Sequence, residues 1–86
     1  MFSHEITFSE WKMIAEDGSV YESICSIFSS PVFKLHCVKQ ISGLFKSVVR
    51  TFKTGELVEE SIFVYELLIC QKFAEDLTKK IISQLQ

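Results

Sequence analysis

The feature that most constrains the fold is the stretch from residue 57 to residue 85, which reads as one long helix. Its first half, Ile62 to Cys70, is apolar on every side except at Glu66. A helix that is apolar all round has to be covered all round. We therefore expect a central buried helix, wrapped by the rest of the chain or by a second copy. The β-branched and aromatic residues at 62–65 also allow a strand, but the long periodic flanks favour a helix.

Two matches to the S/T-x-x-E capping box predict two short helices near the amino terminus. In this motif each side chain accepts a hydrogen bond from a backbone N–H of the first helical turn that would otherwise lack a partner. The matching pairs are Thr7 with Glu10 and Ser19 with Glu22. We expect the helices at residues 8–16 and 20–29.

A third helix is predicted over residues 31–53. Pro31 suits the first helical position, and Gly55 suits the left-handed position that follows a helix end. The short connection at 54–56 would make this helix antiparallel to the long one at 57–85. The sequence therefore predicts an all-α fold: a small bundle of about four helices with a long antiparallel C-terminal hairpin, forming a single domain over residues 1–86.

The third predicted helix would carry a narrow basic stripe opposite its apolar face. Residues 31–53 contain no acidic residue. The stripe consists of Lys39, Lys46, Arg50 and Lys53. It could dock an acidic protein, nucleic acid or lipid headgroups, or it could be a solvated face that neutralises the acidic segments on either side. Nucleic acid is the least expected ligand, because the chain has a net charge of −2.

Glu66 is a second candidate for partner binding. On a helical projection it lies near Phe73 and Leu77, on the apolar side of the long helix. A buried carboxylate needs a cation or a hydrogen-bond donor, or else it is protonated. Its counterpart could lie on a partner chain, or it could be a lysine, an arginine or a tyrosine hydroxyl of this chain.

The three cysteines, Cys25, Cys37 and Cys70, are odd in number and lie among apolar neighbours. This pattern indicates reduced core residues and an intracellular, cytoplasmic location. No signal peptide is expected. The longest apolar run is shorter than the ~20 residues of a membrane span, so we expect none.

No motif for catalysis, metal binding or cofactor binding is present. The sequence lacks C-x-x-C, H-E-x-x-H, a phosphate-binding glycine loop and G-x-S-x-G. His36 and Cys37 are adjacent, and helical neighbours point about 100° apart, so they cannot act as a base and a nucleophile on each other. We expect a protein that is not an enzyme and that holds no metal or cofactor.

The stretch from residue 37 to residue 73, CVKQISGLFKSVVRTFKTGELVEESIFVYELLICQKF, resembles the first two helices of a cyclin box. The resemblance lies in the hydrophobic spacing and in the pair Glu59 and Glu60. It implies two packed helices and binding to a kinase partner. The later helices of that five-helix unit, and the lysine and glutamate that contact the kinase, have no counterpart here.

The sequence therefore predicts a non-enzymatic module that binds a partner protein, or itself as an oligomer, through exposed apolar helix surface. Eight phenylalanines in 86 residues leave apolar surface to spare. The alternative is a peripheral membrane or nucleic-acid binder that uses the basic stripe. Binding that weakens steeply with salt would favour this alternative.

Overall fold

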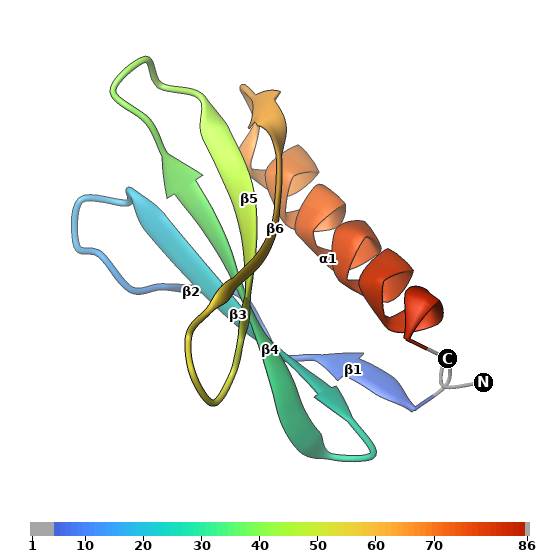
Figure 1. The fold of residues 1–86 in the computed structure, drawn as a ribbon. Coiled ribbons are helices and arrows are strands. Elements are labelled where there is room, and N and C mark those ends of the chain that lie inside the picture. Colours follow the sequence, from blue (N-terminus) through green and yellow to red (C-terminus); the bar gives the residue numbers. More distant parts are fainter. Residues whose placement is uncertain (1–4, 86) are drawn as a thin grey trace.

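The computed structural model describes residues 5–85, and within that range every side chain except that of Ile62. The chain forms an antiparallel sheet followed by one helix at its carboxyl end (Figure 1). The elements are β1 (Ile6–Phe8), β2 (Lys12–Met13), β3 (Val20–Ile27), β4 (Ser30–Lys39), β5 (Phe45–Thr51), β6 (Leu57–Val64) and α1 (Leu67–Gln84).

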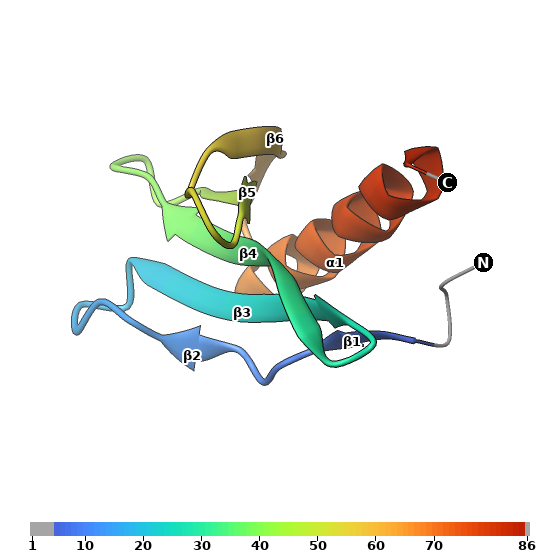
Figure 2. The ribbon, with the colours of Figure 1, turned by 60° about the horizontal axis from the view of Figure 1, so that its bottom comes forward.

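The prediction of an all-α helical bundle was wrong. The strand order is β1-β3-β4-β5-β6, and β2 also pairs with β3, beside β1. The stretches predicted as helices at 8–16, 20–29 and 31–53 lie instead in β1 to β5 and their turns. β1 and β6 lie at opposite edges of a strongly twisted sheet, and α1 runs along one of its faces (Figure 2).

Strand β4 shows why the chain forms a sheet. Phe33, Leu35 and Cys37 are buried on the side of the sheet that α1 covers, whereas Lys34 and His36 between them point to the opposite side. This alternation has a period of two residues, which a helix cannot satisfy. Aliphatic residues also occupy the other face of the sheet and the turns, which is why residues 31–53 also fit a helix with an apolar face.

Tight turns between the strands contain residues with positive φ. Gly43 lies between β4 and β5 with φ 91°, and Gly55 lies between β5 and β6 with φ 75°. The β3–β4 turn has Phe28 at φ 50° and Ser29 at φ 67°, the signs that a type I′ hairpin requires at both central positions. Gly55 is thus left-handed as predicted, but it follows a strand rather than a helix.

Helix α1 was predicted in part. Residues 67–84 are helical, but residues 57–64 form β6, so the helix begins ten residues later than expected. Its buried residues are four apart along the chain: Cys70, Ala74, Thr78 and Ile82. Two of them, Ala74 and Ile82, pack with inward-facing residues of β3, β4 and β5, namely Cys25, Phe33, Leu35 and Val49. No helix in residues 5–85 is long and apolar enough to cross a lipid bilayer.

The two-helix arrangement that the cyclin-box resemblance implied is also wrong. Residues 37–73 hold the end of β4, all of β5 and β6, and only the beginning of α1. The residues Glu59 and Glu60, which contributed to the resemblance, lie in the middle of an edge strand.

Candidate functional site

A corner where β6 meets α1 exposes several large apolar side chains close together in the chain. They lie at the end of β6, in the connection to α1, and in the first two turns of α1: Phe63 (51% exposed), Tyr65 (83%), Leu68 (76%), Ile69 (43%) and Phe73 (38%). We call these five residues the β6–α1 corner. Single exposed apolar residues are common on proteins, whereas several in one short stretch of the chain make this corner a candidate site.

The corner adjoins the free edge of β6, and the hydrogen bonds of β5 show which backbone groups of β6 lie at that edge. The N–H of Phe52 donates to the Val32 carbonyl in β4 at 2.9 Å, and the N–H of Thr51 donates to the Glu56 carbonyl beside β6 at 2.9 Å. Backbone groups alternate in direction along an antiparallel strand. Val49, two residues before Thr51, therefore also faces β6.

Glu59 is the register partner of Val49, so its backbone groups face β5. The backbone groups of the next residue, Glu60, then face outward. Phe63 is the register partner of Lys46, whose own backbone groups face β4, so the backbone of Phe63 also faces outward. Since β6 is the last strand of the sheet, these outward groups form an edge without a neighbouring strand in the described structure.

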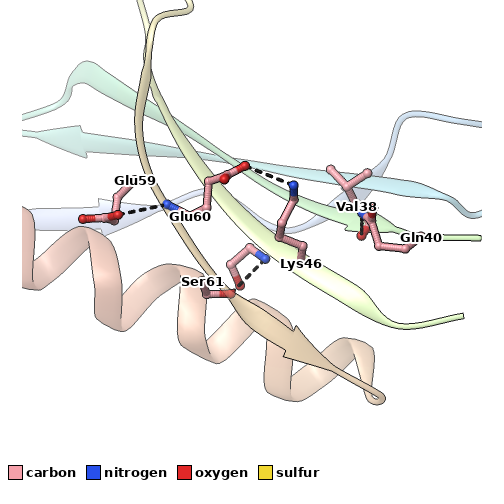
Figure 3. Close-up of polar contacts among 7 residues, drawn as sticks. Val38, Gln40, Lys46, Glu59, Glu60 and Ser61 are labelled. Carbon is pink, nitrogen blue, oxygen red and sulfur yellow. Dashed lines mark hydrogen bonds and ion pairs between the residues drawn. The ribbon is translucent and has the colours of Figure 1, made fainter. Parts of the chain in front are cut away.

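Glutamates occupy this edge. The N–H of Glu60 donates to Oε1 of Glu59 at 3.3 Å, and the Glu60 carboxylate lies 3.0 Å from Nζ of Lys46 (Figure 3). The same Nζ lies 5.9 Å from the centre of the Phe63 ring, within the range of a cation–π contact. A carboxylate of the strand itself therefore accepts the hydrogen bond from an outward backbone donor.

Glu66 does not lie in an apolar face, and the prediction that it is buried was wrong. It is exposed at the N-cap of α1, with φ −100° and ψ 131°, and its side chain makes no capping hydrogen bond. Its carbonyl accepts the N–H of Cys70 at 3.0 Å. The difference arises because the chain ends a strand at Val64, so residues that would have surrounded Glu66 on a helix point elsewhere.

The four basic residues predicted to form a stripe are divided among three elements. Lys46 and Arg50 share one face of β5, because a spacing of four is even and keeps side chains on the same side of a strand as well as a helix. Lys39 is at the end of β4, and Lys53 is in the β5–β6 turn. The stripe of a third helix therefore does not exist.

A different basic pair is present on the sheet face opposite α1. Lys34 on β4 is the register partner of Arg50 on β5. Lys34 lies 5.5 Å from the centre of the Phe52 ring, and Nη1 of Arg50 donates to the Gly55 carbonyl at 3.2 Å. Neither cation has a carboxylate within ion-pair distance among residues 5–85.

Two buried thiols meet a serine beneath the start of α1. Oγ of Ser47 donates to the Cys70 carbonyl at 2.8 Å and lies 3.2 Å from the Cys70 sulfur. The hydrogen bond between the two thiols lowers the pKa of Cys70 and, together with burial, raises the pKa of Cys37. All three cysteines are free and fully buried, as predicted for core residues, so no substrate can reach these sulfurs in the folded chain.

His36 lies on the opposite side of the sheet from Cys37, because adjacent strand residues point to opposite faces. Its Nε2 lies 2.9 Å from the Glu22 carboxylate. Among the described residues, no three histidine, cysteine, aspartate or glutamate side chains gather in a way that could hold a metal ion.

The sequence interpretation missed the β6–α1 corner. Residues 62–70, which are apolar on every side except at Glu66, predict a helix that is buried on all sides. This prediction is wrong. In the structure the same residues mark a change from strand to helix, with several of the apolar residues left in solvent.

No protein-family model, curated protein or solved structure matches this chain.

Proposed function

We propose that this protein is a non-enzymatic interaction module that binds a partner protein through the β6–α1 corner. The observation that carries the proposal is the position of five exposed apolar side chains next to an open strand edge. The thiols and the histidine add no support for catalysis, because Cys37 and Cys70 are buried and His36 faces away from them.

A comparison of the free energy gained by burial with the cost of association indicates which contacts a partner has to supply. Full burial of a Leu or Phe side chain contributes about 1.5 to 3 kcal/mol, and the corner residues are already partly covered. Association costs an estimated 4 to 15 kcal/mol or more in lost freedom, so this corner alone gives modest affinity. A partner that also uses the adjacent strand edge gains backbone hydrogen bonds in addition to apolar contact.

Photocrosslinking in cells tests the proposal. A photoreactive amino acid replaces Tyr65, which is 83% exposed, and in a separate variant it replaces Ile41, which is fully exposed in the β4–β5 turn. We expect a discrete adduct from position 65 and none from position 41. Leu68→Asp on the Tyr65 variant should remove the adduct, whereas Ile41→Asp should leave it.

The mass of the adduct identifies the class of partner. An adduct of twice 9.9 kDa means that a second copy of the chain occupies the corner, and a larger or smaller increment means a different protein. Adducts of equal yield from positions 65 and 41 would contradict the proposal. The corner would then bind partners no more strongly than any other exposed apolar residue.

A second candidate function uses the sheet face opposite α1. Like charges placed directly opposite each other on neighbouring strands are destabilising, and Lys34 and Arg50 have this relationship. A bound anionic group would relieve their repulsion. Binding to heparin resin or anionic vesicles that is lost in Lys34→Gln and Arg50→Gln, and that falls steeply with salt, would support this function. Binding that these variants leave unchanged would exclude it.

A further inference from the structure

We propose that the partner adds an extended segment to the free edge of β6, and that this segment carries lysine or arginine residues. The inference rests on the proposed function, since the β6–α1 corner is continuous with this edge. It names the form and the charge of the ligand that the corner would bind.

The backbone of β6 supports strand addition. The outward groups of Glu60 and Phe63 have no neighbouring strand in residues 5–85. An incoming strand would satisfy them with its own backbone, and its side chains would alternate between the two faces of the sheet. On one of these faces it would meet Phe63, and beyond the end of β6 it would reach Tyr65 and Leu68.

The charge along the edge specifies the partner. Four exposed glutamates lie on β6 or at its ends: Glu56, Glu59, Glu60 and Glu66. Only Glu60 has an ion pair among the described residues, with Lys46 of the adjacent strand. The other carboxylates are therefore available to cations of an incoming segment.

The contact between Glu59 and Glu60 indicates how hydrogen bonds at the edge would change when a strand is added. The Glu59 carboxylate accepts the N–H of Glu60, which is the donor that an added strand requires (Figure 3). A carbonyl of the incoming strand would take this N–H, and the released carboxylate would pair with a lysine or arginine beside it. An uncharged segment would release the carboxylate without compensation, so the edge discriminates in favour of basic segments.

A second copy of β6 is a poor occupant of this edge. In a two-fold antiparallel pairing, Glu59 and Glu60 of one copy would lie next to those of the other. Like charges across a strand pair are destabilising, and charged residues on edge strands commonly prevent self-pairing. The acidic edge therefore favours a heterologous basic strand over self-association.

The experiment begins with selection of random peptides, displayed on phage, on the immobilised full-length protein. We expect enriched sequences with Lys or Arg at alternating positions and with apolar residues between them. The best enriched peptide is synthesised with a fluorophore, and its affinity is measured by anisotropy. If no peptide is enriched, or if the enriched peptides lack basic residues, the inference is wrong.

Two substitutions at one position separate the backbone from the side chain. Glu60→Ala removes the carboxylate alone, and Glu60→Pro also removes the outward N–H without breaking the ladder to β5. We expect Glu60→Pro to bind the peptide at least about tenfold more weakly than Glu60→Ala. Equal affinities would overturn strand addition. If Leu68→Asp still abolished binding in that case, the proposed function would stand without it.

A charge exchange provides an independent test that does not depend on a proline. Glu59→Lys should weaken binding of the basic peptide by about tenfold or more, and replacement of the peptide's basic residues with glutamate should restore binding to this variant. Failure of the exchanged pair to bind would contradict recognition of cations at Glu59. If the Tyr65 crosslink persisted in cells while the exchanged pair failed to bind, the proposed function would stand without this inference. Absence of that crosslink in a protein with Glu59 intact would show that the proposed function itself is wrong.

Discussion

The indole Nε1 of Trp11 donates a hydrogen bond to the Glu75 carboxylate at 3.0 Å, across 64 positions in the chain. Trp11 lies between the short strands β1 and β2, and Glu75 lies in the middle of α1. The bond joins the amino-terminal edge of the sheet to the helix. Nζ of Lys79, one turn further along α1, lies 5.8 Å from the centre of the Phe8 ring on the same edge.

We expect Glu75→Ala to destabilise the protein by about 1 to 2 kcal/mol, because the partly buried indole N–H loses its acceptor. The adjacent Asp76→Ala is a matched control. Its ion pair with Lys72 is 3.5 Å long and more than half exposed on both sides, so its removal should cost less than about 0.5 kcal/mol. Urea denaturation measures both values. Equal losses would show that Trp11 does not anchor the edge to α1.

Ser47→Ala should be costly for a related reason. The buried hydroxyl of Ser47 donates to the Cys70 carbonyl at 2.8 Å, and its loss leaves a buried acceptor with one partner fewer. We expect destabilisation of about 1 to 3 kcal/mol. Ser83→Ala removes an equally short bond to the Lys80 carbonyl on the exposed side of α1 and should have a much smaller effect. A Ser83 effect as large as that of Ser47 would contradict the importance of burial.

One substitution in the β3–β4 turn should stabilise the protein. Ser29 has φ 67°, a conformation that glycine adopts without strain and that costs other residues roughly 1 kcal/mol. We expect Ser29→Gly to raise the free energy of unfolding by about 0.5 to 1 kcal/mol. Thermal denaturation of the two proteins at equal concentration is sufficient. A lower melting temperature for the variant would exclude a left-handed conformation at this position.

Burial of Cys25 gives the stability a pH dependence. Burial raises the pKa of this thiol from 9.0 to about 11. Below pH 9 the thiol is protonated in both states. Between pH 9 and 11 the unfolded chain releases a proton that the folded chain retains, so the free energy of unfolding falls as the pH rises. In Cys25→Ala this part of the decline should be absent. Identical declines in urea titrations of both proteins would show that Cys25 is accessible.

The second half of the long predicted helix could be recognised from sequence because its buried residues follow a helical period. Cys70, Ala74, Thr78 and Ile82 recur every four residues, and a charged face lies opposite them. The sheet was missed because its alternation was incomplete. In β4, the lysine and histidine between buried residues indicate a strand, but Val32 and Val38 interrupt the pattern at both ends.

The capping boxes were misleading because the same polar residues serve turns and strand contacts. The Ser19 N–H donates to the Asp17 carboxylate in a local turn, and the Glu22 carboxylate contacts His36 across the sheet. Asp and Ser make such local bonds readily, so these motifs do not by themselves distinguish a helix start from a hairpin turn.

The candidate site could be predicted only in part. Lys46 and Arg50 share a face in either structure because they are four residues apart. The exposure of Glu66 and of the β6–α1 corner depends on the end of β6, and therefore on strand pairing between residues distant in sequence. A period read within one segment does not contain that information.

The most direct test of the open β6 edge is amide hydrogen exchange, measured residue by residue by NMR on the isolated protein. The N–H groups of Glu59 and Val64 face β5, and those of Glu60 and Phe63 face the free edge. We expect Glu60 and Phe63 to exchange at least about 100-fold faster than Glu59 and Val64. Equal protection of all four amides would mean that the edge is already covered, and it would contradict the account of how this protein binds its partner.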